Sequence, residues 1–126
     1  GMEDTKNNTR ITLVLALNYS AKWEILRAAR LLAEQAKNGD LNPADINETV
    51  FESALSTRGI PDPELLIRTS GETRISNFLL WQIAYAELYF TPVFWPDFGK
   101  KELFEAVLSY QRRERRFGMT SEQVTP

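Results

Sequence analysis

Two apolar runs, set far apart in the chain, most constrain the fold. Residues 11–17 (ITLVLAL) and 64–69 (ELLIRT) are rich in β-branched and aliphatic side chains, which is typical of strands buried on both faces of a sheet. A third, short strand is predicted over residues 88–93. Because helical segments separate these runs, the sequence predicts an α/β fold with a parallel sheet of about three strands and flanking helices.

The first helix is predicted over residues 23–37, between a serine that suits an N-cap and a glycine that ends it. Ser20 and Gly39 hold those two positions. Its apolar stripe is expected to contain four residues: Ile25, Ala29, Leu32 and Ala36.

Three further helices are predicted downstream. Asp45 and Glu48 have the spacing of a capping box before a helix that runs through Leu55. A helix that is apolar nearly all round is expected from Ser76 to about residue 86. The last helix is expected over residues 100–115, and the tail after it has no periodicity.

The chain of 126 residues contains no histidine and no cysteine. It therefore has no imidazole base, no thiolate nucleophile and no disulfide, and any metal must bind carboxylate oxygen, which favours Mg²⁺. The net charge of −2 gives no general attraction to nucleic acid. No run is long enough to span a bilayer, and a cytoplasmic location is expected.

An anion site is predicted where the run 64–69 ends. Arg68 lies at the carboxyl end of this strand, and Arg74 and Ser76 follow a glycine turn at the expected start of a helix. Ligands of parallel sheets bind at this edge, and arginine with a helix N-terminus favours a diphosphate. The alternative is that Ser76 only caps a helix while the arginines pair with Glu72 and Asp62.

Two other features favour structural roles. The basic run 112–116 (RRERR) is typical of a solvated helix end that complements the helix dipole. The aromatic residues between 81 and 98 have the spacing of a core or a dimer interface.

Residues 62–82 (DPELLIRTSGETRISNFLLWQ), with 84–90 (AYAELYF) and 95–98 (WPDF), strongly resemble the cis-prenyltransferases. Residues 18–22 (NYSAK) stand where that family has Asn-Tyr-Gly-Gly-Arg. The resemblance covers the C-terminal half of the family's fold, over residues 11–118. Residues 1–10 are then a disordered or expression-derived leader, and residues 119–126 a tail.

The resemblance implies a Mg²⁺-dependent transferase that condenses isopentenyl diphosphate with an allylic diphosphate, as in undecaprenyl diphosphate synthesis for the cell-wall lipid carrier. It implies that Arg68, Arg74, Ile75 and Ser76 hold isopentenyl diphosphate and that Glu87 binds the metal. Arg116 and Gly118 resemble a C-terminal motif that reaches the partner's site in a homodimer. On a straight helix Ser76 and Glu87 would lie about 16 Å apart, too far to share one ion.

The family's N-terminal aspartate motif and the helices of its hydrocarbon tunnel have no counterpart in this sequence. No catalytic residue is therefore assigned, and the chain is expected to bind an allylic diphosphate only together with the absent half. Two alternatives remain open. The chain is either the isopentenyl-diphosphate half of a synthase, inactive alone, or a non-catalytic scaffold subunit that pairs with a complete synthase.

Overall fold

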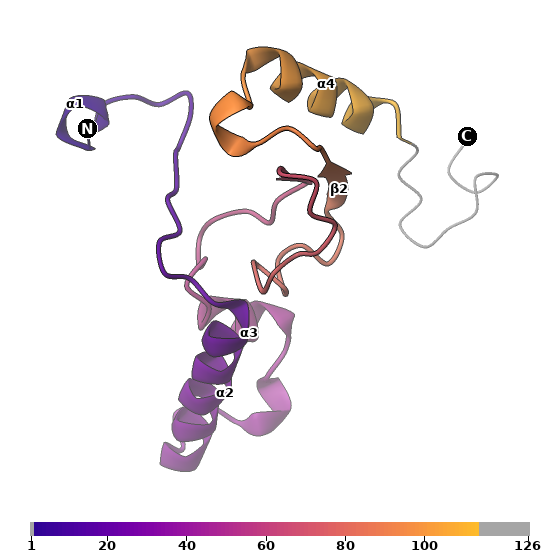
Figure 1. Ribbon diagram of the computed structural model, residues 1–126. Helices are drawn as coiled ribbons and strands as arrows, with labels where there is room; N and C mark the ends of the chain where they lie inside the picture. Colours follow the sequence, from indigo (N-terminus) through magenta and orange to yellow (C-terminus); the bar gives the residue numbers. More distant parts are fainter. Residues whose placement is uncertain (1, 114–126) are drawn as a thin grey trace, which may run out of the picture.

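The computed structural model describes residues 2–113, which contain four helices and two strands (Figure 1). The helices are α1 (Met2–Thr5), α2 (Ala21–Asn38), α3 (Glu48–Ser53) and α4 (Lys100–Gln111). The strands are β1 (Leu65–Arg68) and β2 (Glu87–Phe90), and short 3₁₀ turns occupy Pro43–Asp45 and Trp95–Asp97. Helices α2 and α3 pack together, and α4 packs against β2.

The two strands form a parallel pair, which confirms the α/β class and the parallel sheet. Leu65 pairs with Glu87 and Arg68 with Phe90. These strands are the predicted runs 64–69 and 88–93. The sheet of the described residues has two strands rather than about three, because the first apolar run does not join it.

Residues 11–17 were predicted to be a buried strand, and that prediction is wrong. They form an extended segment with no assigned strand, and its larger apolar side chains stay largely exposed, from 56% at Val14 to 85% at Ile11 and Leu17. Within residues 2–113, no backbone hydrogen bond joins this segment to a neighbour. A strand needs a partner for its N–H and C=O groups, and here none lies beside it.

Helix α2 begins and ends where the sequence predicted. The hydroxyl of Ser20 accepts a hydrogen bond from the backbone N–H of Trp23, and Gly39 ends the helix with φ 80°. The buried face differs from the predicted stripe, since it consists of Ala21, Glu24, Ala28 and Leu32. Ala28 and Leu32 form a core with Ala54 and Leu55 beyond α3, which Phe51 and Trp81 help to cover.

The start of α3 corrects a second prediction. Asn47, not Asp45, caps this helix by accepting a hydrogen bond from the N–H of Val50 at 3.0 Å. Asp45 lies in the preceding 3₁₀ turn. Asn47 is as good a cap by type as Asp45, so the sequence offered two start points and the structure uses the later one.

The predicted helix from Ser76 to about residue 86 is also wrong. The chain there forms a series of turns, and Ser76, Asn77 and Leu79 have positive φ values of 56°, 61° and 49°. A right-handed helix cannot contain such residues. This segment instead folds back onto α2 and α3, where Trp81 contacts Phe51 with ring centroids 4.5 Å apart. The last helix is confirmed in α4, which ends at Gln111.

Candidate functional site

Arg68 is the last residue of β1 and therefore lies at the carboxyl end of this strand. The carbonyl oxygen of Arg68 accepts a hydrogen bond from the N–H of Thr91, which ties this end of β1 to the chain after β2. Its guanidinium Nε is buried and has no hydrogen-bond partner among the described residues. A buried donor without a partner is costly, and a phosphate oxygen would satisfy it.

The segment after Arg68, residues 69–79, is called the arginine loop here. Its first turn is fixed by backbone bonds, from the N–H of Ser70 to the carbonyl of Val93 and from the N–H of Gly71 to that of Thr91, at 2.8 and 2.9 Å. Both residues have positive φ values. These two amides are therefore occupied, and no helix begins at this turn, so anion binding here depends on side chains.

Arg74 and Ser76 are both exposed on this loop, and Ile75 is half-buried. The guanidinium of Arg74 pairs with the carboxylate of Glu72, as the structural alternative predicted for this arginine. Its side chain remains 70% exposed, so the pair is screened by water and is worth little. A diphosphate can displace Glu72 at small cost. Ser76 is not a helix cap, because no helix follows it.

Glu87 lies at the other end of the sheet from Arg68. It is the first residue of β2 and pairs with Leu65 in the register, three residues before the partner of Arg68. Its carboxylate accepts a hydrogen bond from Arg113 at 2.6 Å in an ion pair. The predicted helix that would have separated Ser76 from Glu87 is absent, so the spacing argument based on it no longer applies.

The described residues do not form a magnesium site by themselves. No three acidic side chains of residues 2–113 are placed so that together they could hold a metal ion, and Glu87 is already paired with Arg113. A magnesium ion usually binds one or two carboxylates and completes its shell with phosphate oxygen and water. Glu87 alone would supply one such ligand. Arg116 and Gly118, the other predicted site residues, lie outside the described residues.

A buried carboxylate in α2, that of Glu24, was not predicted from the sequence. Glu24 is only 1% exposed, and it accepts hydrogen bonds from the hydroxyl of Tyr19, from Nε2 of Gln82 at 2.9 Å and from the N–H of Ser56 at 2.8 Å. Burial raises the pKa of Glu24, but these hydrogen bonds outweigh it and hold the pKa below its ordinary value of 4.5. A signal was present, since Glu24 shares its helical stripe with Ala21, Ala28 and Leu32.

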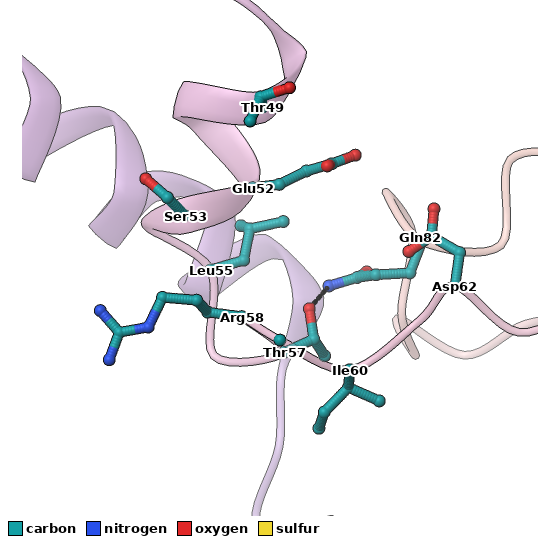
Figure 2. Close-up of a pocket in the computed structure, with 10 residues that line it drawn as sticks. Thr49, Glu52, Ser53, Leu55, Thr57, Arg58, Ile60, Asp62 and Gln82 are labelled. Carbon is teal, nitrogen blue, oxygen red and sulfur yellow. Dashed lines mark hydrogen bonds between the residues drawn. The ribbon is translucent and has the colours of Figure 1, made fainter.

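The pocket in Figure 2 is not suited to an anion. Its volume is about 250 Å³, and Glu52, Asp62, Arg58 and the carboxamide of Gln82 contribute to its wall. Burial, together with repulsion from Glu52 and Glu48, raises the pKa of Asp62. Gln82 donates to Thr57 at 2.9 Å inside it. Two carboxylates against one arginine would repel a diphosphate, so the arginine loop is the better candidate.

Comparison with known proteins decides the family. The family model described as putative undecaprenyl diphosphate synthase matches residues 1–118. The chain belongs to this family. It is 56% identical over 120 residues to a ditrans,polycis-undecaprenyl-diphosphate synthase, (2E,6E)-farnesyl-diphosphate specific, of Vibrio cholerae, and 54% identical over 123 residues to an isoprenyl transferase of Chlorobaculum tepidum.

The similarity extends to a solved structure of the same kind. Lavandulyl diphosphate synthase from Lavandula x intermedia, crystallised with dimethylallyl diphosphate, superposes with a TM-score of 0.85 at 44% identity over 90% of this chain and 49% of that chain. The match to the Vibrio protein covers 95% of this chain and 48% of that protein. The match to the Chlorobaculum protein covers 98% of this chain and 46% of that protein. The chain thus spans about half the length of these prenyltransferase relatives. Among the described residues, no helix is both long and apolar enough to cross a membrane.

Proposed function

We propose that this chain binds isopentenyl diphosphate through Arg68, Arg74 and Ser76, and that it forms the isopentenyl-diphosphate half of an isoprenyl transferase site. The observation that carries the proposal is the unpartnered, buried Nε of Arg68 beside a loop with a loosely held second arginine. Two guanidinium groups match a diphosphate, which carries several charged oxygens. The family membership supplies the class of ligand.

The second half of the proposal is that this chain alone does not catalyse condensation. The family's aspartate motif has no counterpart in the sequence, and the described residues bring no acidic cluster near Arg68. Ionisation of an allylic diphosphate requires both diphosphates to be positioned together. An allylic substrate, Mg²⁺ at Glu87 and a homodimer stay predictions from the family resemblance, and a cytoplasmic location stays a prediction from the composition.

Calorimetric titration with isopentenyl diphosphate tests the site. We expect Arg68→Ala to weaken binding by roughly a hundredfold, because it removes charge-assisted hydrogen bonds to the diphosphate. Arg30→Ala is the matched control, since Arg30 is an exposed arginine of α2. Equal affinities for the chain and Arg68→Ala would refute the assignment of Arg68, and no binding by the unmodified chain would refute the proposed function.

A turnover assay tests the second half of the proposal. We expect the purified chain, given isopentenyl diphosphate, an allylic diphosphate and Mg²⁺, to form no condensation product. Radiolabelled isopentenyl diphosphate extracted into organic solvent is the measurement. Product formation above the background of the Arg68→Ala variant would show that the chain carries a complete site.

A further inference from the structure

Asn77 holds the start of α2 although it lies 55 residues further along the chain. Its carbonyl oxygen accepts a hydrogen bond from the N–H of Ala21 at 3.0 Å, and its side-chain oxygen accepts one from the N–H of Lys22 at 2.9 Å. Its side-chain nitrogen donates to the hydroxyl of Ser20, also at 2.9 Å. One residue of the arginine loop therefore makes three bonds to a single helix end.

These bonds complete the first turn of α2. The N–H of Trp23 donates to the hydroxyl of Ser20, and the N–H of Glu24 to its carbonyl oxygen. The first amides of a helix have no partner within the helix, and Asn77 satisfies the two that Ser20 does not. The N-terminus of α2 is therefore occupied by protein and not available to an anion.

The backbone at this point explains why asparagine is present. Asn77 has φ 61°, in the left-handed region that asparagine tolerates better than most residues. Its carboxamide also supplies the acceptor for Lys22 and the donor to Ser20, while the third bond uses its backbone carbonyl. Glycine would accept this φ but would bring neither group, and alanine would bring neither and would add strain.

We infer that Asn77 is a positioning residue that fixes the far end of the arginine loop to α2 and so sets the affinity of the loop for a diphosphate. Its neighbour Ser76 is also left-handed, at φ 56°. The near end of the loop is held separately by Ser70 and Gly71. The inference rests on the proposed function, because Arg74 and Ser76 are the groups that Asn77 would place.

The experiment compares three single variants of the full chain by titration with isopentenyl diphosphate at a temperature where all are folded. Asn77→Gly removes the side-chain bonds without strain, and Ser20→Ala removes a partner of Asn77 outside the loop. Asn47→Ala is the matched control, because Asn47 caps α3 through the same kind of bond. We expect Asn77→Gly to weaken binding by roughly tenfold and Ser20→Ala by less, while Asn47→Ala stays within about twofold of the unmodified chain.

Amide hydrogen exchange on the same samples separates positioning from general loss of stability. The N–H of Lys22, which loses its side-chain acceptor, should exchange faster in Asn77→Gly, while the N–H groups in the sheet keep their protection. The double variant Asn77→Gly/Ser20→Ala should bind about as weakly as Asn77→Gly, since the bond between Asn77 and Ser20 is already lost in Asn77→Gly. Unchanged affinity in Asn77→Gly, with faster exchange at Lys22, would overturn the inference while leaving the proposed function standing. Absence of binding by the unmodified chain would overturn both.

Discussion

The run 11–17 and strand β1 have the same kind of sequence and different structures. Both are continuous aliphatic runs, yet β1 pairs with β2 and is half-buried, whereas the larger apolar side chains of 11–17 are mostly exposed. An apolar cavity of about 470 Å³ separates the C-terminal part of the run from Pro61 and Phe78. The extended path of this run is visible at the left of Figure 1, between α1 and α2.

The difference teaches that apolar sequence alone does not make a strand. β-Propensity reflects packing against neighbours more than an intrinsic backbone preference. Strand β1 has a neighbour in β2, with a backbone bond from Glu87 to Glu64 just before the pair and from Thr91 to Arg68 just after it. The run 11–17 has no such neighbour among residues 2–113, and the chain is anchored beyond its end by Tyr19, whose hydroxyl donates to Glu24 and whose ring contacts Phe78.

The largest expected effect comes from removing that anchor. Glu24→Ala leaves Gln82 and the N–H of Ser56 without their buried acceptor, and releases Tyr19. We expect the free energy of unfolding to fall by roughly 2 to 4 kcal/mol at neutral pH, since buried groups lose their partners. Urea unfolding followed by tryptophan fluorescence measures this.

The loss of stability in Glu24→Ala should depend on pH, in a direction set by the pKa of Glu24. The pKa of Glu24 in the folded chain lies below its ordinary value of 4.5. Its contribution to stability is therefore present above that value and is lost as the pH falls through the folded pKa. The stability difference between the chain and Glu24→Ala should narrow as the pH falls below 4.5. A constant difference down to acid unfolding would show that Glu24 is not ionised in its site.

A smaller effect is expected from placing a charge in β1. Leu66 is half-buried and lies opposite Leu88 in the parallel pair. We expect Leu66→Asp to lower the free energy of unfolding by about 2 kcal/mol, because a charged group in a partly buried position loses hydration. Urea unfolding monitored by circular dichroism gives the value.

The matched substitution in the exposed run should have the smallest effect. Leu15 is 72% exposed, so Leu15→Asp should change the free energy of unfolding by less than about 0.5 kcal/mol. The difference in unfolding free energy between Leu66→Asp and Leu15→Asp thus reports how differently the two runs are buried. A cost at Leu15 equal to that at Leu66 would show that residues 11–17 are covered in solution, and the comparison would fail.

Elements that local chemistry specifies could be predicted from the sequence. Ser20 and Gly39 bounded α2 correctly because a cap and a left-handed glycine act within one turn of the helix. The two paired strands and α4 were likewise predicted. The turns after Ser76 were not predicted, because the apolar pattern of this segment also fits a helix. Hydrogen bonds between α2 and the side chains of Asn77 and Gln82 hold it in turns instead. Such long-range contacts leave no periodic signal.

The candidate site was likewise predicted only where local sequence and strand order determine it. Arg68 was correctly placed at the end of a strand, where sequence order and sheet geometry suffice. The expected helix dipole behind Ser76 was wrong, and the pairing of Glu87 with Arg113 was not foreseen. Asn77 was missed because its left-handed backbone cannot be read from the sequence pattern. Glu24 was missed because a carboxylate is not expected on the buried face of a helix.

The reach of Asn77 back to Ala21 has a consequence for how the chain is made. A ribosome adds about 5–20 residues per second, so the 55 residues between Lys22 and Asn77 take about 3–11 s to synthesise. Until then α2 emerges with two amides of its first turn open to solvent. The helix can coil early, but its first turn is completed only when the loop that bears Arg74 arrives, so the order of synthesis and the assembly of the site are linked.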